Sequence, residues 1–312
     1  MSRRTTAYLL LLLVSIIWGT ASPVVKYTLQ WFDPWIFLTY RFAISALIAL
    51  PALWLTKTKF PTKSRDVGLV MLTSIISAPL TLWLFFEALT KTTALSGSLF
   101  TATGPLLLVL GGALFFHERI RSHERWGIAI TIFGTLITAF SPFLFGGQKD
   151  SLGPLEGNLI MFAAVIADMS AALLSKEAVK RNISPSLLAH IQFIIGFVVF
   201  VPLLLLRQSP DAIWQTIMSA PWQAHMGVLF MAVLSGTVAY TIRNIAIKRI
   251  EVSESGLFTY LQPLWAAILA VLWLHESITV SYIVGGIIIA LGVLVAEQKT
   301  GTNHGSSKSK KS

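Results

Sequence analysis

The chain has 312 residues, of which 54% are hydrophobic and only 12% are charged, and its mean hydropathy is +0.72. This composition excludes a single soluble globule and indicates a membrane protein. The formal charge of +10 does not indicate nucleic-acid binding, because the basic residues lie in short clusters between apolar segments, as the positive-inside rule predicts. The absence of cysteine excludes disulfides and thiol chemistry.

Ten mostly apolar stretches of roughly 17 to 23 residues are each long enough to cross about 30 Å of hydrocarbon as a helix. We therefore predict an all-α integral membrane protein with ten transmembrane helices. In chain order the predicted spans are Ala7–Tyr27, Pro34–Thr56, Val67–Leu89, Ala94–Phe116, Trp126–Phe145, Pro154–Leu174, Pro185–Leu206, Ala224–Ile245, Ser255–Leu274 and Ile278–Ala296.

Lys and Arg are distributed unevenly between the two sides of these spans. One side carries 18 of the 24 basic residues, and the other carries only Lys26, Lys91, Lys149 and Arg207. Since cytoplasmic loops collect Lys and Arg, both termini are predicted to face the cytoplasm.

One block of the sequence occurs twice, because residues 88–139 align without a gap on residues 246–297. This block is the best-matching part of a larger repeated unit that holds five predicted spans. Because five is an odd number, the second copy of the unit must be inverted in the membrane. We predict two inverted five-helix repeats, residues 5–145 and 154–298. Residues 299–312 are rich in Gly, Ser and Lys and are predicted to form a disordered basic cytoplasmic tail.

Several motifs recur at matching places in the two copies. The first copy holds Pro105-Leu106 and Phe115-Phe116-His117-Glu118, the second holds Pro263-Leu264 and Trp273-Leu274-His275-Glu276, and Trp18-Gly19 lies in the first span. Over nearly the whole chain, this pattern resembles the EamA domain of the drug/metabolite transporter superfamily.

The resemblance implies a ten-helix inverted-repeat carrier with a central cavity, located in the inner membrane of bacteria or the membrane of archaea. Members of this group often export amino acids and related metabolites, and others carry choline or sugar-nucleotide-type substrates. The second copy departs from the first, since Asp168 stands near the place that Trp18 holds.

Asp168 lies near the middle of the sixth predicted span, where an ionised carboxylate costs at least about 2.5 to 3.5 kcal/mol on insertion scales. The residue is predicted to be a protonatable site or a counter-charge for a substrate amine. The alternative is a structural hydrogen bond to a neighbouring helix.

Three other charged residues lie inside predicted spans. Arg41 is suited to a bidentate grip on a substrate carboxylate, although its position two turns from the start of the second span also suits snorkelling to the surface. Arg243 and Glu87 lie near opposite ends of the eighth and third spans and are predicted to be gate or interface charges.

Six aromatic residues lie deeper in the membrane than the interfacial tryptophans: Trp18, Trp83, Phe100, Tyr240, Tyr260 and Trp265. One interpretation is that they line a cavity and attract an ammonium group, an interaction worth about 0.5 to 2 kcal/mol. Tyr240 is also a candidate gate residue. The alternative is that these aromatics face lipid or fill the core.

Proline is predicted to interrupt three spans, at Pro79, Pro105 and Pro263. Interrupted helices at matching places in two repeats point to a transport site, so the neighbouring Thr103 and Gln262 are candidate polar contacts to the substrate. Alternatively, the prolines act only as kinks that let the bundle rock.

These observations predict a secondary active or facilitative transporter that exports small metabolites, amino acids foremost, by alternating access around a midplane cavity. The alternative is a proton-coupled or exchange transporter of organic cations, including quaternary amines. The expected partners are the lipid bilayer, a small-molecule substrate and protons as a candidate coupling ion, with no nucleic acid. The sequence leaves the oligomeric state open.

An enzyme is not expected, because the sequence has no nucleophile–base cluster. His117-Glu118 and His275-Glu276 do not continue as His-Glu-x-x-His, so neither a metal nor another cofactor is predicted. The sequence also lacks a nucleotide-binding loop, which indicates that a gradient drives transport.

Overall fold

The computed structural model describes residues 3–56, 58–144, 153–247 and 258–297. The predicted basic tail, residues 299–312, and the start of the ninth predicted span lie outside the described residues. Within these ranges the regular structure is entirely helical. The elements are α1 (Arg3–Gly19), α2 (Ala21–Thr28), α3 (Pro34–Leu55), α4 (Ser64–Ile75), η1 (Ile76–Leu80), α5 (Thr81–Lys91), α6 (Ala94–Phe116), α7 (Ser122–Ala139), α8 (Ser141–Leu144), α9 (Leu155–Lys180), α10 (Pro185–Leu205), α11 (Pro210–Ser219), α12 (Trp222–Leu229), η2 (Phe230–Val238), α13 (Ala239–Ile247), α15 (Gln262–Leu272) and α16 (Val280–Ala296).

Seven helices in the described part of the chain are long and apolar enough to cross a membrane. Three of them combine consecutive elements, since α1 continues into α2, α4 continues through the π-helical η1 into α5, and α12 continues through the π-helical η2 into α13. Helices are expected here because a spanning segment must pair its own backbone N–H and C=O groups in hydrocarbon. The chain is a multi-pass membrane protein.

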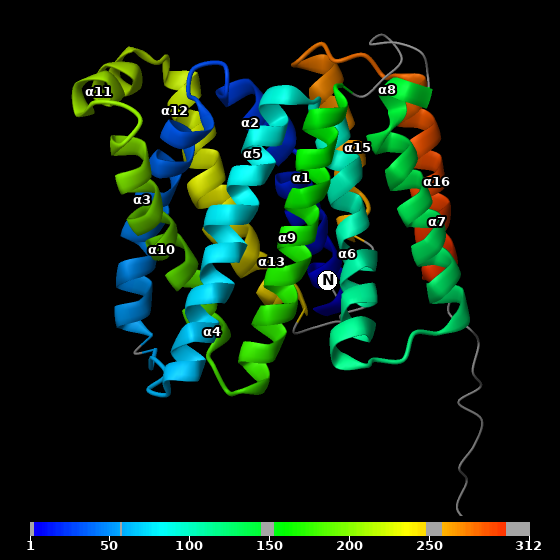
Figure 1. Ribbon diagram of the computed structural model, residues 1–312, viewed down its shortest axis with the longest axis horizontal. Helices are drawn as coiled ribbons and strands as arrows, with labels where there is room; N and C mark the ends of the chain where they lie inside the picture. Colours follow the sequence, from blue (N-terminus) through cyan, green and yellow to red (C-terminus); the bar gives the residue numbers. More distant parts are fainter. Residues whose placement is uncertain (1–2, 57, 145–152, 248–257, 298–312) are drawn as a thin grey trace, which may run out of the picture.

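The long helices lie side by side with their axes roughly parallel (Figure 1). We call the end of the bundle that carries α11 the α11 face, and the end at which α4 begins the α4 face. α3 packs along α10 and α7 along α16, while α9 contacts both α5 and α6, and α1 contacts both α13 and α15. The contacts of α9 with α5 and α6 thus have a counterpart in the contacts of α1 with α13 and α15.

The core is built largely from phenylalanine. Five of these side chains are completely buried: Phe32, Phe37, Phe42, Phe86 and Phe100. Edge-to-face contacts connect them across helices, as between Phe37 and Phe86, whose ring centroids lie 4.7 Å apart.

Glycines allow α7 and α16 to pack at very short range. A Cβ atom at Gly127 would lie 2.5 Å from the backbone N of Ala296 and 2.5 Å from the carbonyl oxygen of Gly292, and a Cβ at Gly134 would lie 3.0 Å from the backbone N of Ile289. Because van der Waals packing largely drives helix association in lipid, these close backbone contacts stabilise the pair.

The three predicted interruptions have different outcomes. Pro79 lies in η1, where the helix widens to π geometry, and Pro263 begins α15 directly after a turn at residues 260–261. The prediction for Pro105 is wrong, because α6 runs without a break from Ala94 to Phe116. A single proline removes one backbone hydrogen bond, which a long packed helix can tolerate.

We expect Gly127→Ala to lower the thermal unfolding temperature in detergent, because the new methyl group must displace the backbone of α16, at a cost of about 1 to 3 kcal/mol. Gly68→Ala is the matched control, since its Cβ would meet nothing within 4 Å. The control should unfold at the same temperature or slightly higher, because alanine favours helix over glycine. Equal unfolding temperatures for the two variants would contradict the assigned packing.

Candidate functional site

Arg41 is a buried cation without a full set of partners. α3 begins where the Asp33 carboxylate accepts hydrogen bonds from the backbone N–H groups of Trp35 (2.8 Å) and Ile36 (2.9 Å), and this start places Arg41 two turns into the helix. Its side chain is only 5% exposed, and neither Nε nor Nη1 has a hydrogen-bond partner. The guanidinium carbon lies 5.9 Å from the ring centroid of Phe86, so the side chain stays inside the bundle and does not snorkel.

Trp18 connects α1 to the span that contains η2 and α13. Its indole Nε1–H donates to the carbonyl oxygen of Ser235 (3.0 Å), which lies in η2. The Trp18 ring packs edge-to-face on Tyr240 with centroids 5.0 Å apart, and the Arg243 guanidinium carbon lies 6.0 Å from the Trp18 ring.

Tyr240 brings these residues together with Asp168. Its hydroxyl lies within electrostatic range of Asp168 on α9, Arg243 on α13 and Arg41 on α3. In the described part of the chain, no hydrogen bond or ion pair joins Asp168 to another residue. The predicted alternative of a structural hydrogen bond therefore has no support.

Asp168 is exposed, and Tyr240 is 48% exposed although its ring packs on Trp18 of α1. We call Trp18, Arg41, Asp168, Tyr240 and Arg243 the central polar cluster. Its residues come from four helices that are distant in sequence. Among the described residues, no hydrogen bond or ion pair satisfies Nε and Nη1 of Arg41 or the carboxylate of Asp168.

Comparison with known proteins agrees with the fold. The EamA-like transporter family matches this chain twice, over residues 5–140 and 155–297. The chain belongs to the EamA-like transporter family. Its relatives are named as transporters, so it is a transporter and not an enzyme.

The chain is similar to several transporters over nearly its whole length. It is 26% identical to "Uncharacterized transporter YyaM" of Bacillus subtilis (strain 168), over 93% of this chain and 92% of that protein. It is 23% identical to a "Probable amino-acid metabolite efflux pump" of Salmonella typhimurium, over 92% of this chain and 93% of that protein. A solved crystal structure aligns with a TM-score of 0.63 at 16% identity, covering 97% of this chain and 100% of that chain.

Four other predicted site residues of this EamA-like transporter lie away from the central polar cluster. Phe100 is completely buried in the core, and the Thr103 hydroxyl donates to the carbonyl oxygen of Phe100 (2.6 Å). Tyr260 packs against a small apolar cluster of α6, α7 and α16. Glu87 interacts electrostatically with Lys91 at the α11 face.

Three predicted residues stabilise contacts between helices. The Trp265 indole donates to the Ser15 hydroxyl (3.1 Å), and a Cβ atom at Gly19 would lie 2.7 Å from the carbonyl oxygen of Gln262. α1 and α15 therefore pack closely. Trp83 lies against Trp35 with ring centroids 5.8 Å apart, and its buried Nε1 has no hydrogen-bond partner.

The sequence analysis did not detect Asn158, a buried residue that connects several helices. Its Oδ1 accepts from the hydroxyls of Thr92 (2.7 Å) and Ser96 (2.8 Å), and its Nδ2 donates to the carbonyl oxygens of Thr138 (3.4 Å) and Ala139 (3.3 Å). The sequence feature that could have identified Asn158 is a single amide side chain at the start of an apolar span. In lipid such a side chain requires internal partners.

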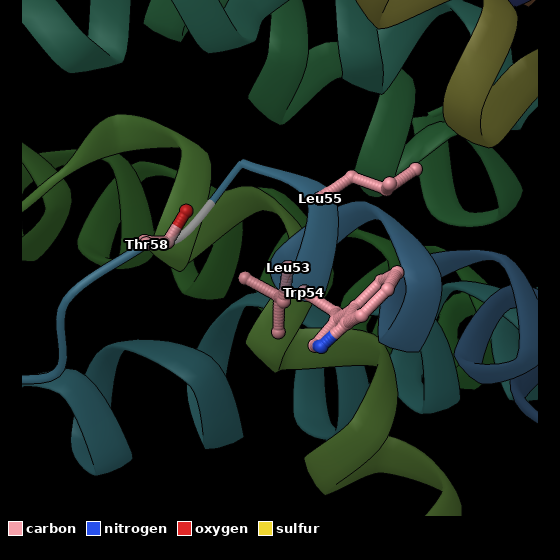
Figure 2. Close-up of a pocket in the computed structure, with 4 residues that line it drawn as sticks. All are labelled: Leu53, Trp54, Leu55 and Thr58. Atoms are coloured by element: carbon pink, nitrogen blue, oxygen red, sulfur yellow. The ribbon is translucent and has the colours of Figure 1, made fainter.

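A surface hollow of about 520 Å³ lies where α3 ends, lined by Leu53, Trp54, Leu55 and Thr58 (Figure 2). It lies at the C-terminal end of α3, whereas Arg41 lies two turns from the N-terminal end, and the polar side-chain groups of its described lining residues are the Thr58 hydroxyl and the Trp54 indole N–H. It therefore does not belong to the central polar cluster.

Stability measurements distinguish a buried polar residue with unpaired groups, Arg41, from one whose groups are hydrogen-bonded, Asn158. We expect Arg41→Met to leave the thermal unfolding temperature unchanged or to raise it, because the variant removes a buried charge with unpaired donors. We expect Asn158→Ala to lower it, because unpaired hydroxyls and carbonyls remain, each costing about 1 to 3 kcal/mol. The reverse order would contradict the assignment of Arg41 as an unsatisfied charge.

Proposed function

We propose that this EamA-like transporter exports small zwitterionic metabolites, amino acids foremost, by alternating access around the central polar cluster. One observation carries the proposal: Arg41, a buried cation, and Asp168, an anion, both lie in electrostatic range of the Tyr240 hydroxyl, and neither has an ion-pair partner among the described residues. Unpaired charges are costly in a membrane interior, and a zwitterion supplies a counter-charge to each. Its carboxylate binds the guanidinium of Arg41, and its ammonium group binds the carboxylate of Asp168.

The aromatic residues of the cluster suit such a substrate. Trp18 and Tyr240 form an aromatic wall that favours a substrate ammonium group through cation–π attraction. The name of the Salmonella relative agrees with an amino-acid metabolite as the cargo. An organic cation is the second candidate, favoured by Asp168 and the aromatic wall, but it would leave Arg41 unpaired.

The proposed architecture has ten spans in two inverted repeats, residues 5–145 and 154–298. The double family match and the paired helix contacts support it. A shared turn supports it further, since His117 and His275 both adopt left-handed backbone with φ of 55°. In each copy the following glutamate donates its backbone N–H to the carbonyl oxygen of the residue six positions earlier. Glu118 donates to Gly112 (3.4 Å), and Glu276 donates to Ala270 (3.0 Å).

The π-helical segments support transport through this bundle. η1 lies in the third predicted span and η2 in the eighth, which are matching places in the two repeats. π-helical turns occur frequently at functional sites, and irregular helices at matching places suit two repeats that rock against each other. We place the α4 face on the cytoplasmic side of an inner membrane, with both termini, because most Lys and Arg residues lie there.

The test is uptake of radiolabelled amino acids and choline-like amines into proteoliposomes. We expect saturable amino-acid uptake, and we expect Arg41→Gln and Asp168→Asn each to reduce it at least about tenfold, since hydrogen bonds to charged groups contribute about 1.5 to 3 kcal/mol. Arg119→Gln and Asp211→Asn are matched controls at exposed sites and should transport normally. Normal amino-acid uptake by Arg41→Gln would contradict the zwitterion proposal, and uptake of amines alone would favour the organic-cation function.

Substrate accumulation under a pH gradient tests separately whether transport is coupled to protons through Asp168. With an imposed pH gradient, we expect the native protein to accumulate substrate above equilibrium, because a carboxylate at membrane depth can exchange a proton during each cycle. Asp168→Asn should equilibrate substrate without responding to the gradient. A gradient response that persists in Asp168→Asn would place the coupling elsewhere.

A further inference from the structure

Glu276 lies in the turn between α15 and α16 but caps a different helix. Its carboxylate accepts hydrogen bonds from the backbone N–H groups of Ala94 (2.8 Å) and Leu95 (3.0 Å), the first residues of α6. Burial raises the pKa of Glu276, while the two N–H donors and nearby Lys26 act in the opposite direction. A carboxylate is favourable at a helix N-terminus, so this contact holds the α15–α16 turn on α6.

Lys26 extends the contact to α2. Its ammonium group donates to the carbonyl oxygens of Leu89 (2.7 Å) and Thr92, at the end of α5, and interacts electrostatically with Glu276. The neighbouring Tyr27 packs on Trp273 with ring centroids 4.2 Å apart. α2, the α5–α6 turn and the α15–α16 turn are therefore joined at one place on the α11 face.

The repeat provides a counterpart of this pair at the opposite face. Glu276 aligns with Glu118, and the spacing that matches Pro34 with Pro185 places Lys26 within one residue of Lys176. Lys176 Nζ and Glu118 Oε1 form an ion pair at the α4 face. These two side chains are 42% and 48% exposed, and among the described residues neither bonds the backbone of a helix end.

We propose that Lys26 and Glu276 form a latch that closes the α11 face, and that Lys176 and Glu118 are its repeat-related counterpart at the α4 face. This inference rests on the proposed alternating access. α2 cannot separate from α5 and α6 while Lys26 bonds the end of α5, and α15 is held to α6 by Glu276. The half-buried pair at the α11 face and the more exposed pair at the α4 face correspond to a conformation closed at the α11 face.

The chain contains no cysteine, so a single introduced cysteine can report on the latch. Ser22 lies on α2 one turn before Lys26, is 4% exposed, and has its Cβ 3.7 Å from a Cβ built at Gly97 on α6. Ser22→Cys is nearly isosteric. The measurement is its rate of labelling by a membrane-impermeant maleimide added to the α11 side of oriented vesicles without substrate.

We expect slow labelling in the Ser22→Cys background and an increase of at least about fivefold when Glu276→Gln or Lys26→Gln is added. Glu118→Gln is the matched control, because it makes the same change in the repeat-related pair at the other face, and it should not increase labelling. An unchanged rate in folded Glu276→Gln and Lys26→Gln would overturn the latch, as would an equal increase in Glu118→Gln.

Size-exclusion profiles and thermal unfolding establish that each variant is folded, and Lys26→Gln decides the matter if Glu276→Gln does not fold. The labelling requires no substrate, so it separates the two proposals. Faster labelling without amino-acid transport by the native protein would support the latch and refute the proposed substrate. Normal amino-acid transport with unchanged labelling would support the proposed substrate and refute the latch.

Discussion

Hydrocarbon offers no hydrogen-bond partner, and this property of the surroundings governs the backbone and the buried side chains alike. Each spanning segment pairs its backbone groups internally, which explains why the described regular structure is helical. The departures from regular α-helix also lie where neighbouring helices cover them. The π-helical turns at η1 and η2 occur within packed spans, and the turn before Gln262 lies against α1.

The same constraint separates two groups of polar residues. Asn158, Lys26 and Glu276 have their hydrogen-bonding groups occupied by backbone or side-chain partners on other helices, and they hold the bundle together. Arg41 and Asp168 lack such partners in the part of the chain that the structure describes, although each is costly to leave alone in a membrane interior. A carrier must leave groups unpaired where a substrate is to bind, so the incomplete pairing is the strongest structural argument for the central polar cluster.

An inverted repeat places similar local structures at opposite faces of a membrane. The turns that contain His117 and His275 have the same backbone conformation, yet the glutamates that follow them have different partners. The repeated motif thus supplies one glutamate at each face, and each glutamate lies near a lysine of another helix. This difference suits a carrier, since a pathway open at both faces would dissipate the gradient that drives it.

Sequence patterns determined the class of this protein, because apolar stretches of membrane-spanning length and alternating basic loops reflect the bilayer directly. They also identified the family and the charged residues inside the spans, and the bounds predicted for α6 are those observed. Tertiary structure decided which of these residues meet. Phe100, Thr103 and Tyr260, which were predicted at membrane depth, face the core or neighbouring helices, whereas Trp18, Arg41, Asp168, Tyr240 and Arg243 converge. The physical reason is that an apolar face can pack equally well on lipid or on another helix, so helix rotation is set by close packing between neighbours, such as the glycine contacts of α7 with α16, and not by hydropathy.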